Sequence, residues 1–168
     1  FILLISSVSV PLALSFDKKL KFYKQWKYVL PSIAFVAAFY IICDIYLTSV
    51  GIWGFNPAYH SGINLLGLPI EEWLFFIVIP YASIFLHEAF ILHFPKIHLN
   101  LKLSQTITVI FIVFLVLLIV FNTDKTYTVY ASGLMFSSLI FSFFEKSSLL
   151  GCLYITFLLI LIPFLIVN

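Results

Sequence analysis

The chain is a series of long apolar runs joined by short polar connections, and this pattern constrains its fold more than any other feature. A bilayer core takes about 20 apolar residues per helix, so we expect six spans. They lie near residues 1–16, 29–50, 69–93, 104–122, 127–144 and 148–167. With 63% hydrophobic and 10% charged residues and a mean hydropathy of +1.17, a soluble domain is excluded. The predicted fold class is an all-α, polytopic transmembrane helical bundle, an integral multi-pass protein of the plasma membrane.

Lysines predict how this bundle is oriented in the membrane. The connection between the first two spans carries five of them: Lys18, Lys19, Lys21, Lys24 and Lys27. Such clustering is typical of a cytoplasmic loop, which puts the loop from Gly51 to Leu68 on the other face. The formal net charge is only +2, so we expect the lipid bilayer and no nucleic acid as a partner.

Two adjacent carboxylates, Glu71 and Glu72, stand at the start of the third apolar run, just after Pro69. Proline fits the first turn of a helix, and the positive end of the helix dipole favours acidic groups there. Carboxylates in lipid are costly and usually functional. The sequence therefore predicts an acidic pair at a helix start that faces apolar surroundings.

Asp44 is a third costly group, located near the end of the second span. Tyr40, Asp44 and Thr48 follow i, i+4, i+8 spacing, which places them on one face of a helix. That end of the second span has the same depth as the start of the third. We therefore expect Asp44 to meet Glu71 or Glu72.

Three carboxyl groups in an apolar site cannot all ionise cheaply, so at least one is expected to stay protonated. A protonated carboxyl beside an aromatic-lined space can donate a proton to an alkene, and aromatic faces stabilise the resulting cation. The aromatic residues expected to line the substrate site are Trp53, Phe55, Trp73, Phe75, Phe76 and Tyr40.

Structural readings of the same residues stay open. Glu71 and Glu72 can serve helix-start electrostatics alone, and Asp44 can act as a hydrogen-bonded link between two spans. His87 and Glu88 are expected to face interfacial water at the other membrane surface. No ligand set with recognisable metal spacing occurs, so no metal site is predicted. His60 is left without an assigned role.

A set of closely spaced motifs within residues 5–90 resembles the lycopene cyclase family of the heterodimeric or fused bacterial, archaeal and fungal membrane type. The matching positions are Ser15-Phe16-Asp17-Lys18-Lys19, Trp26-Lys27, Asp44 with Thr48, Gly51 to Pro57, Tyr59, Gly62, Leu68 to Phe76, and Pro80-Tyr81. The resemblance implies a membrane enzyme of carotenoid biosynthesis. It would close β-ionone rings on lycopene, giving γ-carotene and then β-carotene, an isomerisation without net redox.

The resemblance also implies two related halves, each with a Pro-x-Glu-Glu or Pro-x-Glu-Asp signature. This chain has one such signature, while Ser142 to Lys146 is similar to Ser15 to Lys18, and Asn168 stands at the place of Asp44. We therefore predict two related three-helix repeats in a truncated fused form, with about seven spans in the intact protein. The expected domains are 1–93 as the first repeat, 94–126 as a linker helix and 127–168 as an incomplete second repeat. A partner repeat or subunit is expected to complete the site.

The working hypothesis is that Glu71 and Glu72 act as proton donor and acceptor, in an order that the sequence does not fix, while Asp44 tunes or relays the proton. The sequence has no Gly-rich dinucleotide fingerprint, so no cofactor is predicted. One alternative is a carotenoid hydratase, in which water captures the same cation. Another is a non-catalytic carotenoid-binding or proton-coupled transport protein, which would use the acidic cluster for anchoring or transport.

Overall fold

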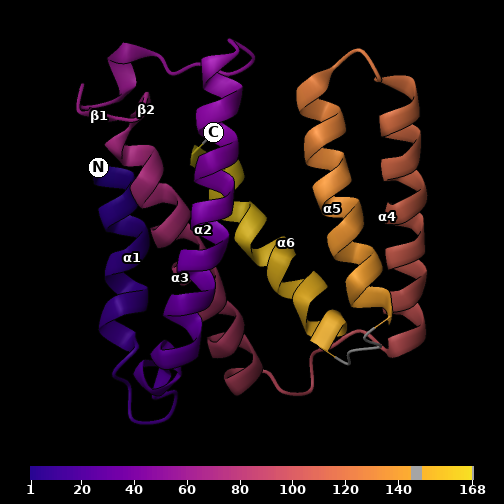
Figure 1. Cartoon of the computed structure of the whole chain (residues 1–168). Helices are drawn as coiled ribbons and strands as arrows, with labels where there is room; N and C mark the ends of the chain where they lie inside the picture. Colours follow the sequence, from indigo (N-terminus) through magenta and orange to yellow (C-terminus); the bar gives the residue numbers. More distant parts are fainter. Residues whose placement is uncertain (145–148, 168) are drawn as a thin grey trace. The chain divides into compact units, whose positions relative to one another are not determined.

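The structure is a computed structural model of the chain, and it describes residues 1–144 and 149–167. It is mostly helical, and the chain falls into two units, Phe1–His93 and Phe94–Asn168, called unit 1 and unit 2 below (Figure 1). The sequence matches at Glu145, Lys146 and Asn168 lie outside the described residues. The two repeats, like the division of 94–168 into a linker helix and a second repeat, stay predictions.

Unit 1 is built from three helices. They are α1 (Ile2–Leu14), α2 (Trp26–Ser49) and α3 (Ile70–His93), and both α1 and α2 pack against α3. A 3-10 turn, η1 (Phe22–Gln25), leads directly into α2, which explains why this helix begins a few residues before the predicted span.

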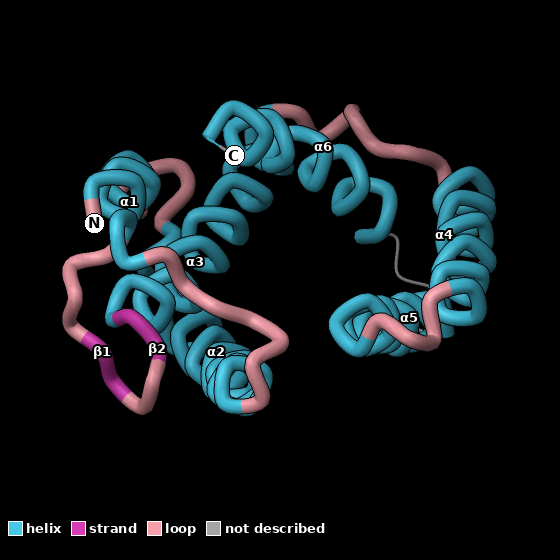
Figure 2. Tube along the Cα trace, turned by 90° about the horizontal axis from the view of Figure 1, so that it is seen from above, coloured by secondary structure: helices cyan, strands magenta, loops and turns pink. Residues whose placement is uncertain are grey.

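The connection from α2 to α3 forms a second 3-10 turn, η2 (Pro57–Tyr59), and a small hairpin of β1 (Asn64–Leu65) and β2 (Leu68–Pro69). Leu66 and Gly67 both have positive φ, at 52° and 84°, the combination that a type I′ two-residue turn requires. Seen from above, the hairpin lies at the edge of the unit, beside α2 and the start of α3 (Figure 2).

The expected position of Pro69 in the first helical turn is wrong. Pro69 lies in β2, opposite Asn64, and α3 begins at Ile70. The N–H of Ile70 donates to the carbonyl of Ile63 at 2.9 Å. The chain therefore stays bonded to the hairpin until the helix starts.

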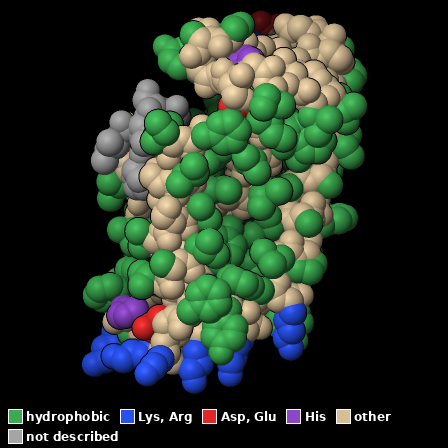
Figure 3. All heavy atoms as spheres, turned by 90° about the vertical axis from the view of Figure 1, so that its left-hand side faces the viewer, with side chains coloured by type: hydrophobic (Ala, Val, Ile, Leu, Met, Phe, Trp, Pro, Cys, Tyr) green, Lys and Arg blue, Asp and Glu red, His purple; other side chains and the backbone are tan. Residues whose placement is uncertain are grey.

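The core of unit 1 consists of two buried clusters at different heights along the helices. We call the first the basic-end cluster; it contains Phe22, Val29, Ile33, Tyr81 and Phe85. The second, the carboxyl-end cluster, contains Ala37, Ile41 and Leu68, with Ile45, Phe55, Trp73 and Phe76 packed against it. Figure 3 shows lysine side chains gathered at one end of this unit and mostly hydrophobic side chains along its length.

Unit 2 contains α4 (Leu101–Phe121), α5 (Thr126–Phe144) and α6 (Leu149–Val167), and α4 packs against both other helices. The side chain of Asn100 caps α4 by accepting the N–H of Leu103 at 2.8 Å. The hydroxyls of Thr108 and Tyr154 meet at 2.5 Å and link α4 to α6. One polar contact thus joins two mostly apolar helices.

Within the described residues, four helical segments are long and apolar enough to cross a membrane: Phe22–Ser49, Ile70–His93, Leu101–Phe121 and Thr126–Phe144. Ile2–Leu14 and Leu150–Ile162 are shorter apolar helices. The all-α architecture is confirmed and the long apolar helices fit a membrane protein, while six crossings remain a prediction. Two of these segments contain α2 and α3, so the acidic residues lie near the ends of helices long enough to cross a membrane.

Candidate active site

A sharp turn after α2 brings the acidic residues of two helices to the same end of unit 1. The N–H groups of Ile52 and Trp53 donate to the carbonyl of Leu47 at 3.0 and 3.3 Å, and Gly51 has a φ of 72°, a backbone conformation that suits glycine. The chain then returns through η2 and the hairpin into α3. The last two turns of α2 and the first turn of α3 therefore lie side by side.

Asp44 and Glu72 are the carboxyl groups that this arrangement pairs. Both are half-buried, and they lie close enough for their charges to interact. The sequence left open whether Asp44 meets Glu71 or Glu72. Of the two glutamates, Glu72 is the one near enough for its charge to interact with that of Asp44. We call Asp44 and Glu72 the carboxyl pair.

Glu71 has a different set of neighbours. Its Oε1 accepts the backbone N–H of Ser61 at 2.8 Å, which ties the loop to the start of α3. Its Oε2 is buried without a hydrogen-bond partner among the described residues. Glu71 therefore faces the loop, and Ser61, which the sequence did not single out, helps to fix its position.

Aromatic rings gather at the same end of unit 1 as the carboxyl pair. Tyr40 stacks on Phe76, with ring centroids 5.8 Å apart and an interplanar angle of 11°. Phe55, Trp73 and Phe76 pack against the carboxyl-end cluster, and the indole N–H of Trp73 donates to the carbonyl of Leu65 at 3.2 Å. The hairpin thereby holds one of the predicted substrate-binding rings in position.

Two further predicted rings form an outer layer at the same end. Phe75 meets Phe76 edge to face at 5.7 Å, and Trp53 meets Phe55 in the same way at 6.3 Å. Phe75 and Trp53 are 38% and 39% exposed. All six aromatic residues predicted from the sequence thus lie at the carboxyl end, four against or beside the buried cluster and two outside it.

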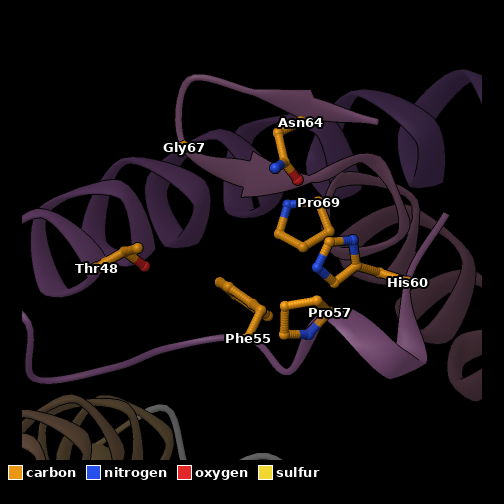
Figure 4. A pocket seen from close by; sticks show the side chains of 7 residues that line it. All are labelled: Thr48, Phe55, Pro57, His60, Asn64, Gly67 and Pro69. Atoms are coloured by element: carbon orange, nitrogen blue, oxygen red, sulfur yellow. The ribbon is translucent and has the colours of Figure 1, made fainter. Parts of the chain in front are cut away.

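A cavity of about 350 Å³ opens between the end of α2, the loop and the hairpin. Its lining is mixed, with apolar and polar side chains facing one space (Figure 4). The lining residues are Thr48, Phe55, Pro57, His60, Asn64, Gly67 and Pro69. Sequence reasoning placed Thr48, Phe55 and Pro69 near the site and Pro57 in the family motif, but it gave no role to His60, Asn64 or Gly67, because their positions depend on the hairpin, which periodicity does not reveal.

No group of three or more His, Cys, Asp or Glu residues that could hold a metal ion occurs in the described part of the chain. The site therefore offers carboxyl groups, rings and a polar cavity. Its chemical capacity is proton transfer beside an aromatic surface that can face a cation.

The remaining motif residues meet at the opposite end of unit 1. The hydroxyl of Tyr81 bonds to Ser15 Oγ at 2.6 Å and accepts the indole N–H of Trp26 at 3.1 Å. Gln25 donates to Glu88 Oε2 at 3.1 Å. These side chains link α1, η1 and α2 to α3, so their role in the structure is to hold the helices together.

Asp17 organises the turn after α1 at this same end. Its Oδ1 accepts the backbone N–H groups of Lys19 at 2.8 Å and Leu20 at 3.1 Å. These hydrogen bonds to the ionised form hold the pKa of Asp17 below its ordinary value. Asp17 is therefore a turn-forming residue rather than part of the acidic site.

Comparison with known proteins gives one family. The family model described as "Lycopene cyclase" matches residues 1–90, just over half of the chain and nearly all of unit 1. No curated protein and no solved structure matches the chain. The matched region contains both the carboxyl end and the bonded network around Tyr81.

Proposed function

The chain belongs to the lycopene cyclase family, and from that premise we propose that its carboxyl end catalyses the acid-initiated closure of β-ionone rings on lycopene. Membership makes it an enzyme of carotenoid cyclisation, and the apolar helices fit a membrane location. The finer proposal is a lycopene β-cyclase that converts lycopene to γ-carotene and then β-carotene. It would be an isomerase that works as an intramolecular lyase in the plasma membrane.

The observation that carries the proposal is the Asp44–Glu72 pair beside the stacked rings of Tyr40 and Phe76. Two carboxyl groups at short range in an apolar setting share charge poorly, which favours one protonated partner. Glu72 is half-buried and paired with Asp44, so we assign it the role of proton donor. Asp44 tunes that proton, and Glu71 is the candidate acceptor.

The reaction needs one proton in and one proton out. The carboxylic acid protonates the terminal double bond of a ψ end group, so that a C–H bond forms and a tertiary cation remains. The neighbouring double bond attacks this cation and closes a six-membered ring, which moves the positive charge onto a ring carbon. A carboxylate then removes a ring proton, and the electrons of that C–H bond form the β double bond. The substrate and product are isomers, so no oxidant or reductant is consumed.

The aromatic side chains supply the second part of the proposal. Trp73 and Phe76 pack against the carboxyl-end cluster, and so does Phe55 from the loop. Their ring faces would stabilise the intermediate cations, and their apolar surface suits a hydrocarbon substrate. Phe75 and Trp53, which are more exposed, would contact the polyene chain farther from the reacting end.

A second acidic set is proposed to come from a partner. Family resemblance implies two halves with related signatures, and the described part of this chain carries one Pro-x-Glu-Glu sequence at Pro69 to Glu72. We propose that a second repeat or subunit docks within the bilayer and completes the enzyme. No cofactor is assigned a role, because each step of the isomerisation is served by carboxyl and aromatic groups.

The test is pigment analysis of lycopene-accumulating bacteria that express the chain, alone and together with a family subunit that carries a second signature. The expected result is a ring-containing pigment with the same mass as lycopene. A pigment heavier by one water would instead support a hydratase, and lycopene bound without conversion in both settings would support the binding or transport alternative.

A further inference from the structure

Thr48 differs from several other hydroxyl side chains on the described helices. Ser32, Thr106 and Thr108 each donate to the carbonyl four residues earlier, the usual way in which a helix satisfies a buried hydroxyl. Thr48 Oγ1 is buried yet has no hydrogen-bond partner among the described residues. Such a group calls for an explanation, because an unpaired buried hydroxyl is costly.

The cavity offers that explanation. Thr48 lines it, and in Figure 4 its side chain points into the same space as Phe55, His60 and Pro69. The volume of about 350 Å³ and the polar groups of Thr48, His60 and Asn64 meet the conditions for holding water, which needs room and several polar partners. Water can pair with these polar groups, whereas a hydrocarbon beside them would leave them unpaired.

Residues that line the cavity are close in the chain to the acidic residues of both helices. Thr48 follows Asp44 by one helical turn on the same face of α2, and Pro69 precedes Glu71 by two residues at the start of α3. His60 stands beside Ser61, which bonds to Glu71. The backbone N–H of Gly62 donates to His60 Nδ1 at 3.1 Å, which leaves Nε2 as the donor of the neutral ring.

We propose that this cavity is the proton-entry route of the enzyme, in which water held by Thr48, His60 and Asn64 exchanges protons with the carboxyl pair of Asp44 and Glu72. The inference rests on the proposed function and adds a positioning residue, Thr48. Ring closure removes a proton from the donor acid and delivers another to an acceptor carboxylate. Between turnovers, cavity water takes up the acceptor's proton and returns one to the donor, so the proton count balances.

The route can be tested without turnover, by infrared spectroscopy of the full chain in lipid vesicles. The difference between wild type and Glu72→Gln identifies the C=O band of the protonated carboxyl, and transfer into D₂O shifts this band as the proton exchanges. In Thr48→Val, which keeps the shape of the side chain but lacks the hydroxyl, exchange should slow about tenfold, the effect of losing one hydrogen-bonding group from the path. Thr48→Ser should restore the wild-type rate.

Ser49→Ala is the matched control, because Ser49 is the next residue on α2, is exposed and bonds only to its own helix at Tyr46; it should exchange as wild type does. His60→Phe blocks the cavity from the loop side and should also slow exchange, which keeps the test decisive if Thr48→Val does not fold. Wild-type exchange in both Thr48→Val and His60→Phe would overturn the route. The absence of any carboxyl band sensitive to Glu72→Gln or Asp44→Asn would instead overturn the proposed function, and the route with it.

Discussion

The two ends of unit 1 differ in whether their buried polar side chains have hydrogen-bond partners. At the basic end, the hydroxyl of Tyr81 has two partners, Ser15 and Trp26. At the carboxyl end, Thr48 Oγ1 and Glu71 Oε2 are buried without a partner among the described residues. Unpaired buried groups lower stability and persist where they serve a purpose, so the comparison separates an end that holds the helices together from an end that is kept available for chemistry.

The largest effect should come from removing the acid at the carboxyl end. In Glu72→Gln, cyclisation should fall by about a hundredfold or more, the range of general acid catalysis, with helical content unchanged. The measurement is the initial rate of ring formation in membranes that contain the active assembly. The control is Glu88→Gln, which removes a carboxyl group at the basic end of the same helix. This variant should keep the wild-type rate of ring formation. An equal loss of rate in Glu72→Gln and Glu88→Gln would contradict the different roles of the two ends.

Asp44→Asn should have the next largest effect, a fall in rate of about tenfold, because the neighbour that tunes Glu72 loses its charge but keeps its shape. The same rate assay applies, with Asp124→Asn, an exposed residue of the α4–α5 connection, as control. Wild-type activity in Asp44→Asn would show that Asp44 has no role in catalysis.

Tyr81→Phe tests whether the basic end serves stability rather than catalysis. It removes a hydroxyl with two hydrogen bonds and should lower the free energy of unfolding by about 1–3 kcal/mol, while the activity per folded molecule stays at the wild-type value. Unfolding in detergent micelles measures the first quantity and ring formation the second. Tyr23→Phe, at an exposed tyrosine near the same end, should leave both unchanged. A loss of activity per folded molecule in Tyr81→Phe would contradict the claim that the basic end has only a structural role.

The smallest effect should come from Asp17 at acidic pH. Its pKa is lowered in the folded chain by the N–H groups of Lys19 and Leu20, so the unfolded chain binds a proton more readily. The stabilisation is complete above the ordinary value of 3.8 and is lost as the pH falls from there through the folded pKa. Asp17→Asn should therefore reduce the acid sensitivity of unfolding, measured by titration in micelles. If the stability of Asp17→Asn fell at acidic pH as it does in wild type, Asp17 would not be among the residues that stabilise the basic end.

Much of this arrangement is predictable from the sequence, because apolar run length fixes helices in a membrane. The helices begin and end near the predicted spans, and the i, i+4 spacing of Tyr40, Asp44 and Thr48 correctly indicates a shared helical face that reaches the start of α3. Family motifs correctly pointed to the family. They did not separate the residues at the carboxyl end from those around Tyr81, because motif matching carries no spatial information.

The rest depends on the connection between α2 and α3. The hairpin at Leu66 and Gly67 lacks the usual turn residues at its first position, so local signals did not predict it. Without the hairpin, neither the bond from Ser61 to Glu71 nor the position of His60 and Thr48 at one cavity can be derived.

The most direct test of an acid at the carboxyl end is the isotopic composition of the product formed in D₂O. Membranes that contain the chain and a subunit with the second signature are equilibrated in D₂O, supplied with lycopene, and the pigments are analysed by mass spectrometry. Protonation by an exchangeable carboxyl predicts one deuteron for each ring formed, and no labelled ring in Glu71→Gln, Glu72→Gln membranes. Rings that form without deuterium, or full ring formation by the double variant, would contradict the account.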